Sequence, residues 1–126
     1  MNIFPCVKAI IKKDNSFLIV KRAAKETNSP NRWSFVGGGV ELGESYIQAL
    51  QREVMEEASI KVTPVRYISS KTIPAKEGGV VLISYVFCEY ESGTVKLNEE
   101  HDEYLWITEI PDFLPKEHAQ LLKTLQ

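Results

Sequence analysis

The sequence has few of the features that mark several large classes of protein. Its only cysteines, Cys6 and Cys88, lie far apart and match no C-x-x-C zinc spacing, so we expect two reduced strand residues. No apolar run approaches the roughly 18 residues that span a bilayer, and no secretory leader opens the chain. Fifteen Lys and Arg against 17 Asp and Glu give a net charge of -2, without the basic excess that a long nucleic acid requires. We therefore expect a cytoplasmic protein with neither a membrane nor a long nucleic acid as partner.

The chain also lacks internal repeats, low-complexity tracts and a Pro/Gly/Ser-rich linker. Its 126 residues, 44% of them apolar, fit one domain over residues 1–126 with a single core. Strand-forming residues predict strands over 3–13, 17–22, 33–36, 62–74, 80–91 and 104–108. Apolar spacing predicts helices over 45–58 and 116–125. Because strands and helices do not alternate regularly, we expect an α/β (α+β) fold with a mixed β-sheet and helices on its faces.

Three glutamates of the predicted helix 45–58 lie close to its apolar stripe. At about 100° per residue, Glu57 falls inside the apolar sector, and Glu53 and Glu56 border it. Partly buried carboxylates within one turn repel one another and lose hydration, and Arg52 alone cannot neutralise three of them. Mg²⁺ and Mn²⁺ prefer such oxygen ligands, and the i, i+3, i+4 spacing directs them to one point. We therefore expect a divalent metal site here.

Three consecutive glycines, Gly37, Gly38 and Gly39, follow a predicted strand and precede a loop, where bare backbone can approach a ligand. They are not part of a G-x-x-x-x-G-K-[ST] or a G-x-G-x-x-G motif. Together with the helix they resemble the Nudix hydrolase signature, G-x5-E-x7-R-E-U-x-E-E-x-G-U with U apolar. The positions in register are Gly38, Glu44, Arg52, Glu53, Val54, Glu56, Glu57 and Ile60.

Two positions depart from the family pattern. Ser59 stands where the signature has glycine, so we expect a cost of about 1 kcal/mol at the left-handed turn after the helix. The preceding Trp33-x-Phe35-Val36-Gly37-Gly38 is similar to the family's W-x-L-P-G-G, with Val36 in place of proline. Neither departure changes a carboxylate.

The resemblance implies a Nudix-like α/β/α sandwich with a central mixed sheet. It also implies metal-dependent hydrolysis of a phosphoanhydride bond in a nucleoside diphosphate linked to another moiety. By matched position Glu53, Glu56 and Glu57 would bind one to three Mg²⁺ or Mn²⁺ ions, with the Gly38 carbonyl as a further ligand. Glu44 and Arg52 would form an ion pair that braces the loop against the helix. The glycine backbone at 37–39 and Arg22, at the end of the second strand, would contact the substrate phosphates.

The general base has several candidates. Nudix enzymes take it from the signature or from a later loop, and here the acidic stretch 99–103 offers Glu100 and Glu103. The alternative is a solvated acidic turn. We expect His101 to be a surface histidine and not a catalyst. His118 is assigned no role.

The substrate class also stays open. We expect a nucleoside triphosphate, which can be a modified one; ADP-ribose, a dinucleotide or a sugar nucleotide are the alternatives. A non-catalytic Nudix-like nucleotide-binding module would be expected to lose a metal glutamate, and this chain keeps all three. The expected oligomeric state is a monomer or a homodimer.

Overall fold

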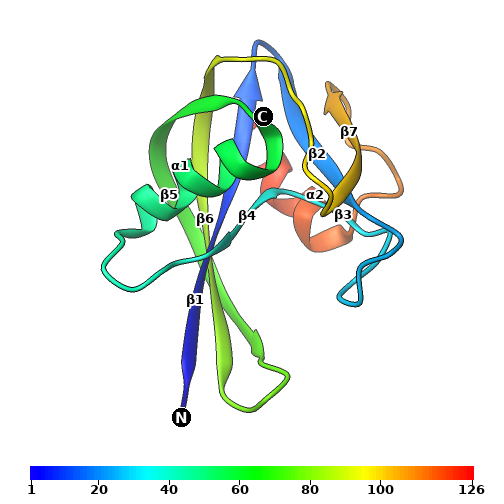
Figure 1. The fold of residues 1–126 in the computed structure, drawn as a ribbon. Coiled ribbons are helices and arrows are strands. Elements are labelled where there is room, and N and C mark those ends of the chain that lie inside the picture. The colour runs from blue at the N-terminus through cyan, green and yellow to red at the C-terminus, as the bar shows by residue number, and fades with distance from the viewer.

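The computed structural model describes residues 1–126, which form seven strands and two helices (Figure 1). The elements along the chain are β1 (Ile3–Lys13), β2 (Ser16–Arg22), β3 (Trp33–Ser34), β4 (Val36–Gly39), α1 (Tyr46–Ala58), β5 (Lys61–Pro74), β6 (Val80–Ser92), β7 (His101–Ile107) and α2 (Lys116–Lys123). Neither helix is long and apolar enough to cross a membrane.

All seven strands belong to one mixed sheet, which confirms the predicted fold class. The main strand order is β3-β2-β1-β6-β5, while β4 pairs with β1 and β7 pairs with β2. Strands β1 and β6 run parallel, and every other pair is antiparallel. The central position of β1 makes it the strand against which the glycine segment lies.

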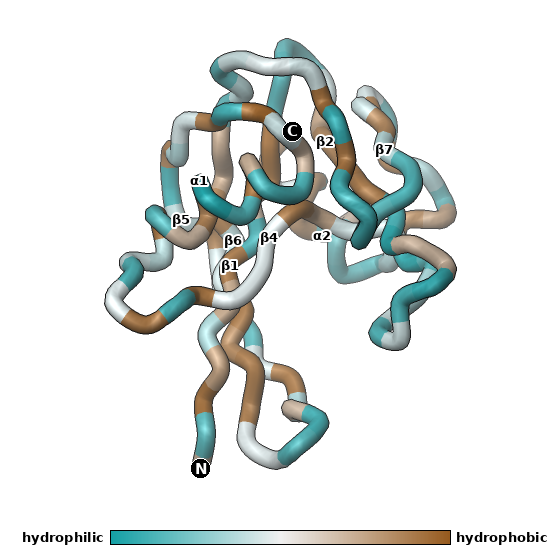
Figure 2. Tube along the Cα trace, viewed as in Figure 1, coloured by the Kyte–Doolittle hydropathy of each residue, from teal (hydrophilic) through white to brown (hydrophobic).

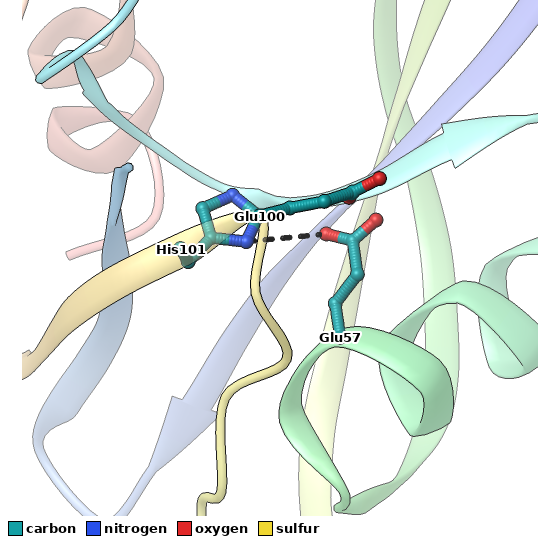
Figure 3. Close-up of side chains that lie close together, drawn as sticks. All are labelled: Glu57, Glu100 and His101. Atoms are coloured by element: carbon teal, nitrogen blue, oxygen red, sulfur yellow. Dashed lines mark ion pairs between the residues drawn. The ribbon is translucent and has the colours of Figure 1, made fainter. Parts of the chain in front are cut away.

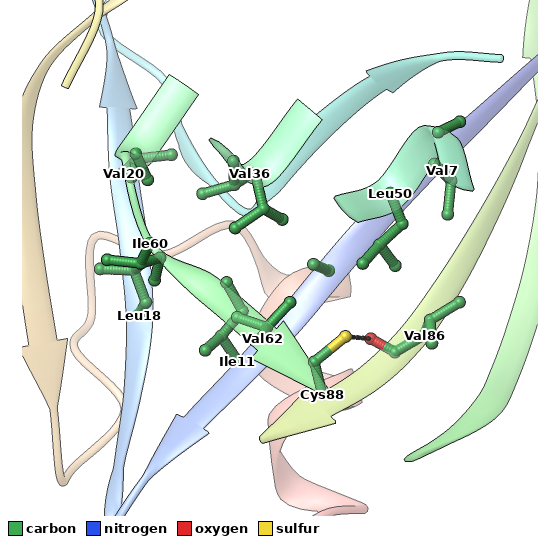
Figure 4. Packing of buried hydrophobic residues seen from close by; sticks show 14 residues of the cluster. Val7, Ile11, Leu18, Val20, Val36, Leu50, Ile60, Val62, Val86 and Cys88 are labelled. Atoms are coloured by element: carbon green, nitrogen blue, oxygen red, sulfur yellow. Dashed lines mark hydrogen bonds between the residues drawn. The ribbon is translucent and has the colours of Figure 1, made fainter. Parts of the chain in front are cut away.

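Successive side chains of the central strands point to opposite faces of the sheet, so the core has two layers. In β2, Leu18 and Val20 point into one apolar cluster, and Phe17 and Ile19 point into the other. The first cluster packs beneath α1 (Figure 4), and the second contains Leu122 of α2. The helices therefore cover opposite faces of the sheet, with α1 in front and α2 behind in Figure 1. This is the three-layer α/β/α arrangement.

Apolar residues are concentrated in the strands, as the tube in Figure 2 shows. Beyond the helices, the N-terminal end of β1 and the β5–β6 hairpin project together from the body of the molecule. Ile3 and Phe4 at that end are exposed because no helix covers them. Both cysteines are free, Cys6 in β1 and Cys88 in β6, as predicted.

Helix α1 has well-defined ends. Ser45 is the N-cap, and its hydroxyl accepts a hydrogen bond from the Gln48 backbone N–H at 3.1 Å. The Gln48 side chain in turn accepts from the Ser45 backbone N–H at 2.9 Å, which completes a capping box. At the other end Ser59 adopts the left-handed conformation, with φ 61° and ψ 25°, so the turn that glycine commonly supplies is kept by serine. The Ser59 hydroxyl donates to the Lys96 carbonyl at 3.0 Å.

The structure corrects the predicted strand 33–36 and the loop after it. Two strands replace it, and the glycines lie inside the second of them, β4, where Gly38 pairs with Val7 and Gly37 with Lys8. A Cβ on Gly37 would collide with the Val7 carbonyl oxygen. Glycine is therefore required at position 37, because the backbones of β4 and β1 approach too closely there for a side chain.

The structure also corrects the start of β7, which begins at His101 and not at Tyr104. Antiparallel pairing with β2 brings Arg22 opposite His101 and Lys21 opposite Glu103. The expectation of a surface histidine is wrong, since only 7% of His101 is exposed. Part of the predicted acidic loop is thus a strand whose first residue is buried.

Candidate functional site

Arg52 of α1 joins the loop before the helix to the helix itself. Its Nε and one terminal nitrogen donate to the two carboxylate oxygens of Glu44, at 2.7 and 2.9 Å. The same terminal nitrogen donates to the Gly39 carbonyl at 3.0 Å. This bidentate contact lowers the pKa of Glu44 to about 2, and a hydrogen bond from the Glu41 backbone N–H adds to the effect. The Glu44–Arg52 pair therefore fixes the position of β4 relative to the helix.

The second terminal nitrogen of Arg52 contacts carboxylates of the helix. It donates to Glu53 at 2.9 Å and to Glu56 at 3.3 Å. The three helix glutamates differ strongly in exposure, since the side chains of Glu53, Glu56 and Glu57 are 14%, 54% and 4% exposed. The row of carboxylates thus runs from open solvent at Glu56 into the protein at Glu57.

Gly38 lies directly against the Glu53 carboxyl group. A Cβ at Gly38 would sit 2.6 to 2.8 Å from the carboxyl atoms of Glu53, whereas a Cβ at Gly39 would have its nearest neighbour, the Pro5 carbonyl oxygen, at 4.0 Å. Only glycine at position 38 lets strand backbone and carboxylate lie this close together.

Glu57 is the buried member of the row. Its Oε1 accepts a long hydrogen bond from the Gly37 backbone N–H at 3.4 Å. Burial raises the pKa of Glu57 to about 8, the neighbouring Glu53 carboxyl adds to the rise, and Lys8 opposes it. Ionising Glu57 at neutral pH therefore requires additional positive charge, which a bound cation would supply.

Glu100, the residue before β7, and His101, its first residue, complete the cluster around Glu57. Ligand atoms of Glu57, Glu100 and His101 all lie within 4.8 Å of one another (Figure 3). The His101 Nδ1 is 3.7 Å from Glu57 Oε1, too far for a hydrogen bond. Burial lowers the pKa of His101 to about 4, with Lys8 and Arg22 adding to the effect, so the imidazole is neutral at pH 7.

The segment before β7 reaches this position because it is hydrogen-bonded to the end of α1. The Asn98 backbone N–H donates to the Glu57 carbonyl at 3.1 Å, and the Lys96 N–H donates to the Ala58 carbonyl at 3.0 Å. These carbonyls of the last helical turn have no partner within the helix. The Glu100 carbonyl in turn accepts from the Ala23 N–H, which fixes the segment to the end of β2.

The fold does not bring Arg22 and Glu103 into the same cluster. Arg22 Nε donates to the Asn28 carbonyl at 2.5 Å, and its guanidinium pairs with Glu26 at 3.7 Å. Glu103 forms an ion pair with Lys21 across the β2–β7 ladder. The predicted residues that do lie together are Glu44, Arg52, Glu53, Glu56, Glu57, Glu100 and the glycines of β4.

The sequence reasoning missed His101 as a member of the site. The only local signal was its place within the acidic stretch 99–103. Its distance from Glu57 depends on the pairing of β7 with β2, which is not visible in the sequence. As a whole the cluster offers several carboxylate oxygens, one imidazole nitrogen and backbone at one place, a donor set that suits a divalent cation.

Comparison with known proteins identifies relatives over nearly the whole chain. The family model of the NUDIX domain matches residues 4–125. Nucleoside triphosphatase NudI from Escherichia coli is 32% identical, and the match covers 78% of this chain and 77% of NudI. The solution structure of the E. coli ORF135 protein is 30% identical with a TM-score of 0.71, and the match covers 95% of this chain and 79% of that one.

A more distant structure has the same fold. The crystal structure of the MutT protein from Methanosarcina mazei Go1 superposes with a TM-score of 0.83 at 24% identity, covering 97% of this chain and 91% of that one. The arrangement of sheet and helices is thus also found in a protein whose sequence is only distantly similar.

Proposed function

This chain belongs to the Nudix hydrolase family, and from that premise we propose that it is a divalent-metal-dependent pyrophosphohydrolase of nucleoside triphosphates, modified ones included. The chain is a Nudix pyrophosphohydrolase. The triphosphate is favoured because the 32% identical relative is named a nucleoside triphosphatase and is matched over three quarters of both chains.

One observation carries the proposal: the buried carboxyl of Glu57 lies between Glu53 of the same helix and Glu100 of the β7 entry, beside the backbone of β4. Acidic groups packed this closely in a partly dehydrated place oppose ionisation unless a cation joins them. The negatively charged phosphates of a nucleotide also bind cations. A metal ion held at this cluster can neutralise the carboxylates and the phosphates together.

The residues have separate tasks in this proposal. Glu53, Glu56 and Glu57, with the Gly38 carbonyl, would hold Mg²⁺ or Mn²⁺, and the bound ion would polarise phosphoryl oxygens and lower the pKa of the attacking water. Arg52 holds Glu53 and Glu56 in place from one side. Its contact with Glu44 keeps the β4 backbone against the helix, and the backbone at 37–39 would face the phosphates.

The loop carboxylates differ in how directly they can act. Glu100 already lies with Glu57 and can serve as ligand or base without rearrangement. Glu103 would first have to leave Lys21, and Arg22 would have to leave Asn28 and Glu26 to reach a phosphate. We therefore place Glu100 ahead of Glu103 in the reaction.

The proposed reaction adds one water across a phosphoanhydride. The water oxygen forms a bond to one of the two phosphorus atoms, α or β, that share the bridging oxygen, and the bond from that phosphorus to the bridging oxygen breaks. The bridging oxygen keeps the electron pair and leaves with the other phosphate fragment, while a carboxylate takes the water proton. The products are a nucleoside monophosphate and pyrophosphate.

The test is a substrate panel assayed with Mg²⁺ and with Mn²⁺. It contains natural and modified nucleoside triphosphates, ADP-ribose, dinucleotides and sugar nucleotides, with products identified by phosphorus NMR. We expect pyrophosphate from a triphosphate and a loss of about 100-fold in kcat for Glu56→Gln, because a ligand charge is removed. Glu109→Gln, at an exposed glutamate that follows β7 and is not part of the cluster, is the matched control and should keep wild-type activity.

Two outcomes would overturn the proposal. Preferential cleavage of ADP-ribose, a dinucleotide or a sugar nucleotide would replace the triphosphate with one of those substrates. Failure to cleave any phosphoanhydride in the panel would favour a nucleotide-binding module.

A further inference from the structure

His101 brings a nitrogen donor into a cluster otherwise made of carboxylates. Only 6% of its side chain is exposed, and the buried Nδ1 atom has no hydrogen-bond partner. A buried polar atom without a partner costs free energy, and nearly all such atoms in folded proteins are satisfied. The unpaired Nδ1 of His101 is therefore free to bind a ligand.

The neighbouring groups do not satisfy this nitrogen. Glu57 Oε1 lies 3.7 Å from Nδ1, beyond hydrogen-bonding distance. The nearby Lys8 ammonium donates to the Gly37 carbonyl at 3.4 Å. Two ligands of one ion, each roughly 2.0 to 2.2 Å from it, are separated by about 3 to 4 Å. The distance between Nδ1 and Oε1 falls in that range.

We propose that His101 Nδ1, together with the carboxylates of Glu57 and Glu100, ligates a transition-metal ion, so that this site binds Mn²⁺, Co²⁺ or Zn²⁺ in preference to Mg²⁺. The inference deepens the metal site of the proposed function and rests on it. Mg²⁺ takes oxygen ligands in near-ideal octahedral geometry and gives up its waters reluctantly, whereas imidazole suits transition metals. One nitrogen among the oxygens therefore shifts selectivity from Mg²⁺ toward the transition metals.

The second buried histidine provides a matched control. His118 also has a buried Nδ1 without a hydrogen-bond partner. Its ring, however, packs edge-on against Phe35 and Tyr85, with centroids 5.1 and 6.4 Å away. Its one carboxylate neighbour, Glu117, is half exposed and already paired with Arg32 and Lys71. His118 thus has the burial of His101 without the carboxylate cluster.

The experiment measures nitrogen coordination directly and needs no substrate. The full chain is labelled with nitrogen-15 histidine, loaded with Mn²⁺, and examined by pulsed EPR for a nitrogen-15 coupling. We expect the coupling in wild type and in His118→Asn, and its loss in His101→Asn. In calorimetric titrations His101→Asn should weaken Co²⁺ binding by about 10-fold or more and change Mg²⁺ binding by less than about 3-fold.

A measurement on the wild type covers the case in which His101→Asn does not fold. Zn²⁺ should shift the nitrogen-15 NMR resonance of one histidine Nδ1, and that histidine should be the one whose signals Mn²⁺ broadens most. Absence of nitrogen coupling in Mn²⁺-loaded wild type, or its loss in His118→Asn and not in His101→Asn, would overturn the inference. Nucleotide hydrolysis without nitrogen coupling would refute this inference alone, and coupling without hydrolysis would refute the proposed function alone.

Discussion

Glu53 lies against the backbone of Gly38, and this contact depends on a single missing methyl group. A Cβ at position 38 would meet all three carboxyl atoms of Glu53 at 2.6 to 2.8 Å. The carboxyl is the end of a flexible side chain, so it can move away while the backbone stays. The same addition at Gly39 meets nothing closer than 4.0 Å. At the scale of residues, the Glu53 carboxylate can therefore occupy its position only because residue 38 is glycine.

We expect Gly38→Ala to separate metal binding from stability. Displacing Glu53 should weaken Mn²⁺ binding by about 10- to 100-fold, while the free energy of unfolding changes by less than about 1 kcal/mol. Gly39→Ala, the matched control, should bind Mn²⁺ like wild type. Calorimetric titration and urea unfolding of both variants measure the two quantities. Equal Mn²⁺ affinities for the two variants would contradict the role given to the Gly38–Glu53 contact.

At the scale of elements, the residues at the two ends of helix α1 determine where the helix starts and stops, and so where its glutamates lie. The capping box at Ser45 and the left-handed Ser59 start and stop the helix, so that Glu53, Glu56 and Glu57 occupy its last turns. The Ser59 hydroxyl also ties the helix end to the Lys96 carbonyl, in the segment that leads to Glu100. Glycine adopts the left-handed conformation without strain, whereas Ser59 adopts it with strain and gains a hydrogen bond.

Two substitutions at Ser59 should separate these contributions. Ser59→Ala loses the hydrogen bond and keeps the strained left-handed conformation, so we expect a loss of about 1 kcal/mol in unfolding free energy. Ser59→Gly loses the same bond but relieves the strain, so its stability should lie within about 0.5 kcal/mol of wild type. Urea unfolding of the three proteins decides the matter. An alanine variant more stable than the glycine variant would show that strain is absent at this position.

At the scale of the whole molecule, three buried titratable groups couple folding to pH. The pKa of Glu57 is raised to about 8 by burial, and burial lowers the pKa values of His101 and His118 to about 4. A raised carboxyl pKa stabilises the fold at low pH, and this stabilisation is lost as pH rises from about 4.5 through 8. A lowered histidine pKa stabilises the fold above about 6.5, and this is lost as pH falls toward 4.

The metal-free protein should therefore be most stable near pH 6.5. Below pH 6.5 the stability that the two histidines lose as pH falls exceeds the stability that Glu57 gains. Above pH 6.5 only the loss from Glu57 remains. We expect thermal unfolding in EDTA to show a falling Tm on both sides, and Glu57→Gln to remove the decline between pH 6.5 and 8. Added Mn²⁺ should raise the wild-type Tm more at pH 8 than at pH 6, because metal binding needs ionised Glu57. A wild-type Tm in EDTA that stayed level from pH 6.5 to 9 would contradict the raised pKa of Glu57.

The sequence by itself determined most of the elements and most residues of the candidate site. Short-range periodicity located both helices and every strand except β4 to within a few residues, because burial on one face repeats every two residues in a strand and every 3.6 in a helix. The same periodicity placed Glu57 in the apolar sector of α1, where the structure buries it. The Nudix signature is one continuous segment, residues 38–60, that runs from β4 through α1, so it could be recognised without the rest of the fold.

Only the tertiary structure decided which distant residues meet this helix. Glu100 and His101 lie with Glu57 because the carbonyls at the end of α1 bind the segment before β7, and because β7 starts to pair with β2 at His101. The same pairing places Glu103 beside Lys21 and away from the cluster. Gly37 pairs with β1 in a strand where the neighbouring backbone leaves no room for a side chain. Contacts between segments far apart in the chain follow from strand pairing and close packing, which local sequence patterns do not contain.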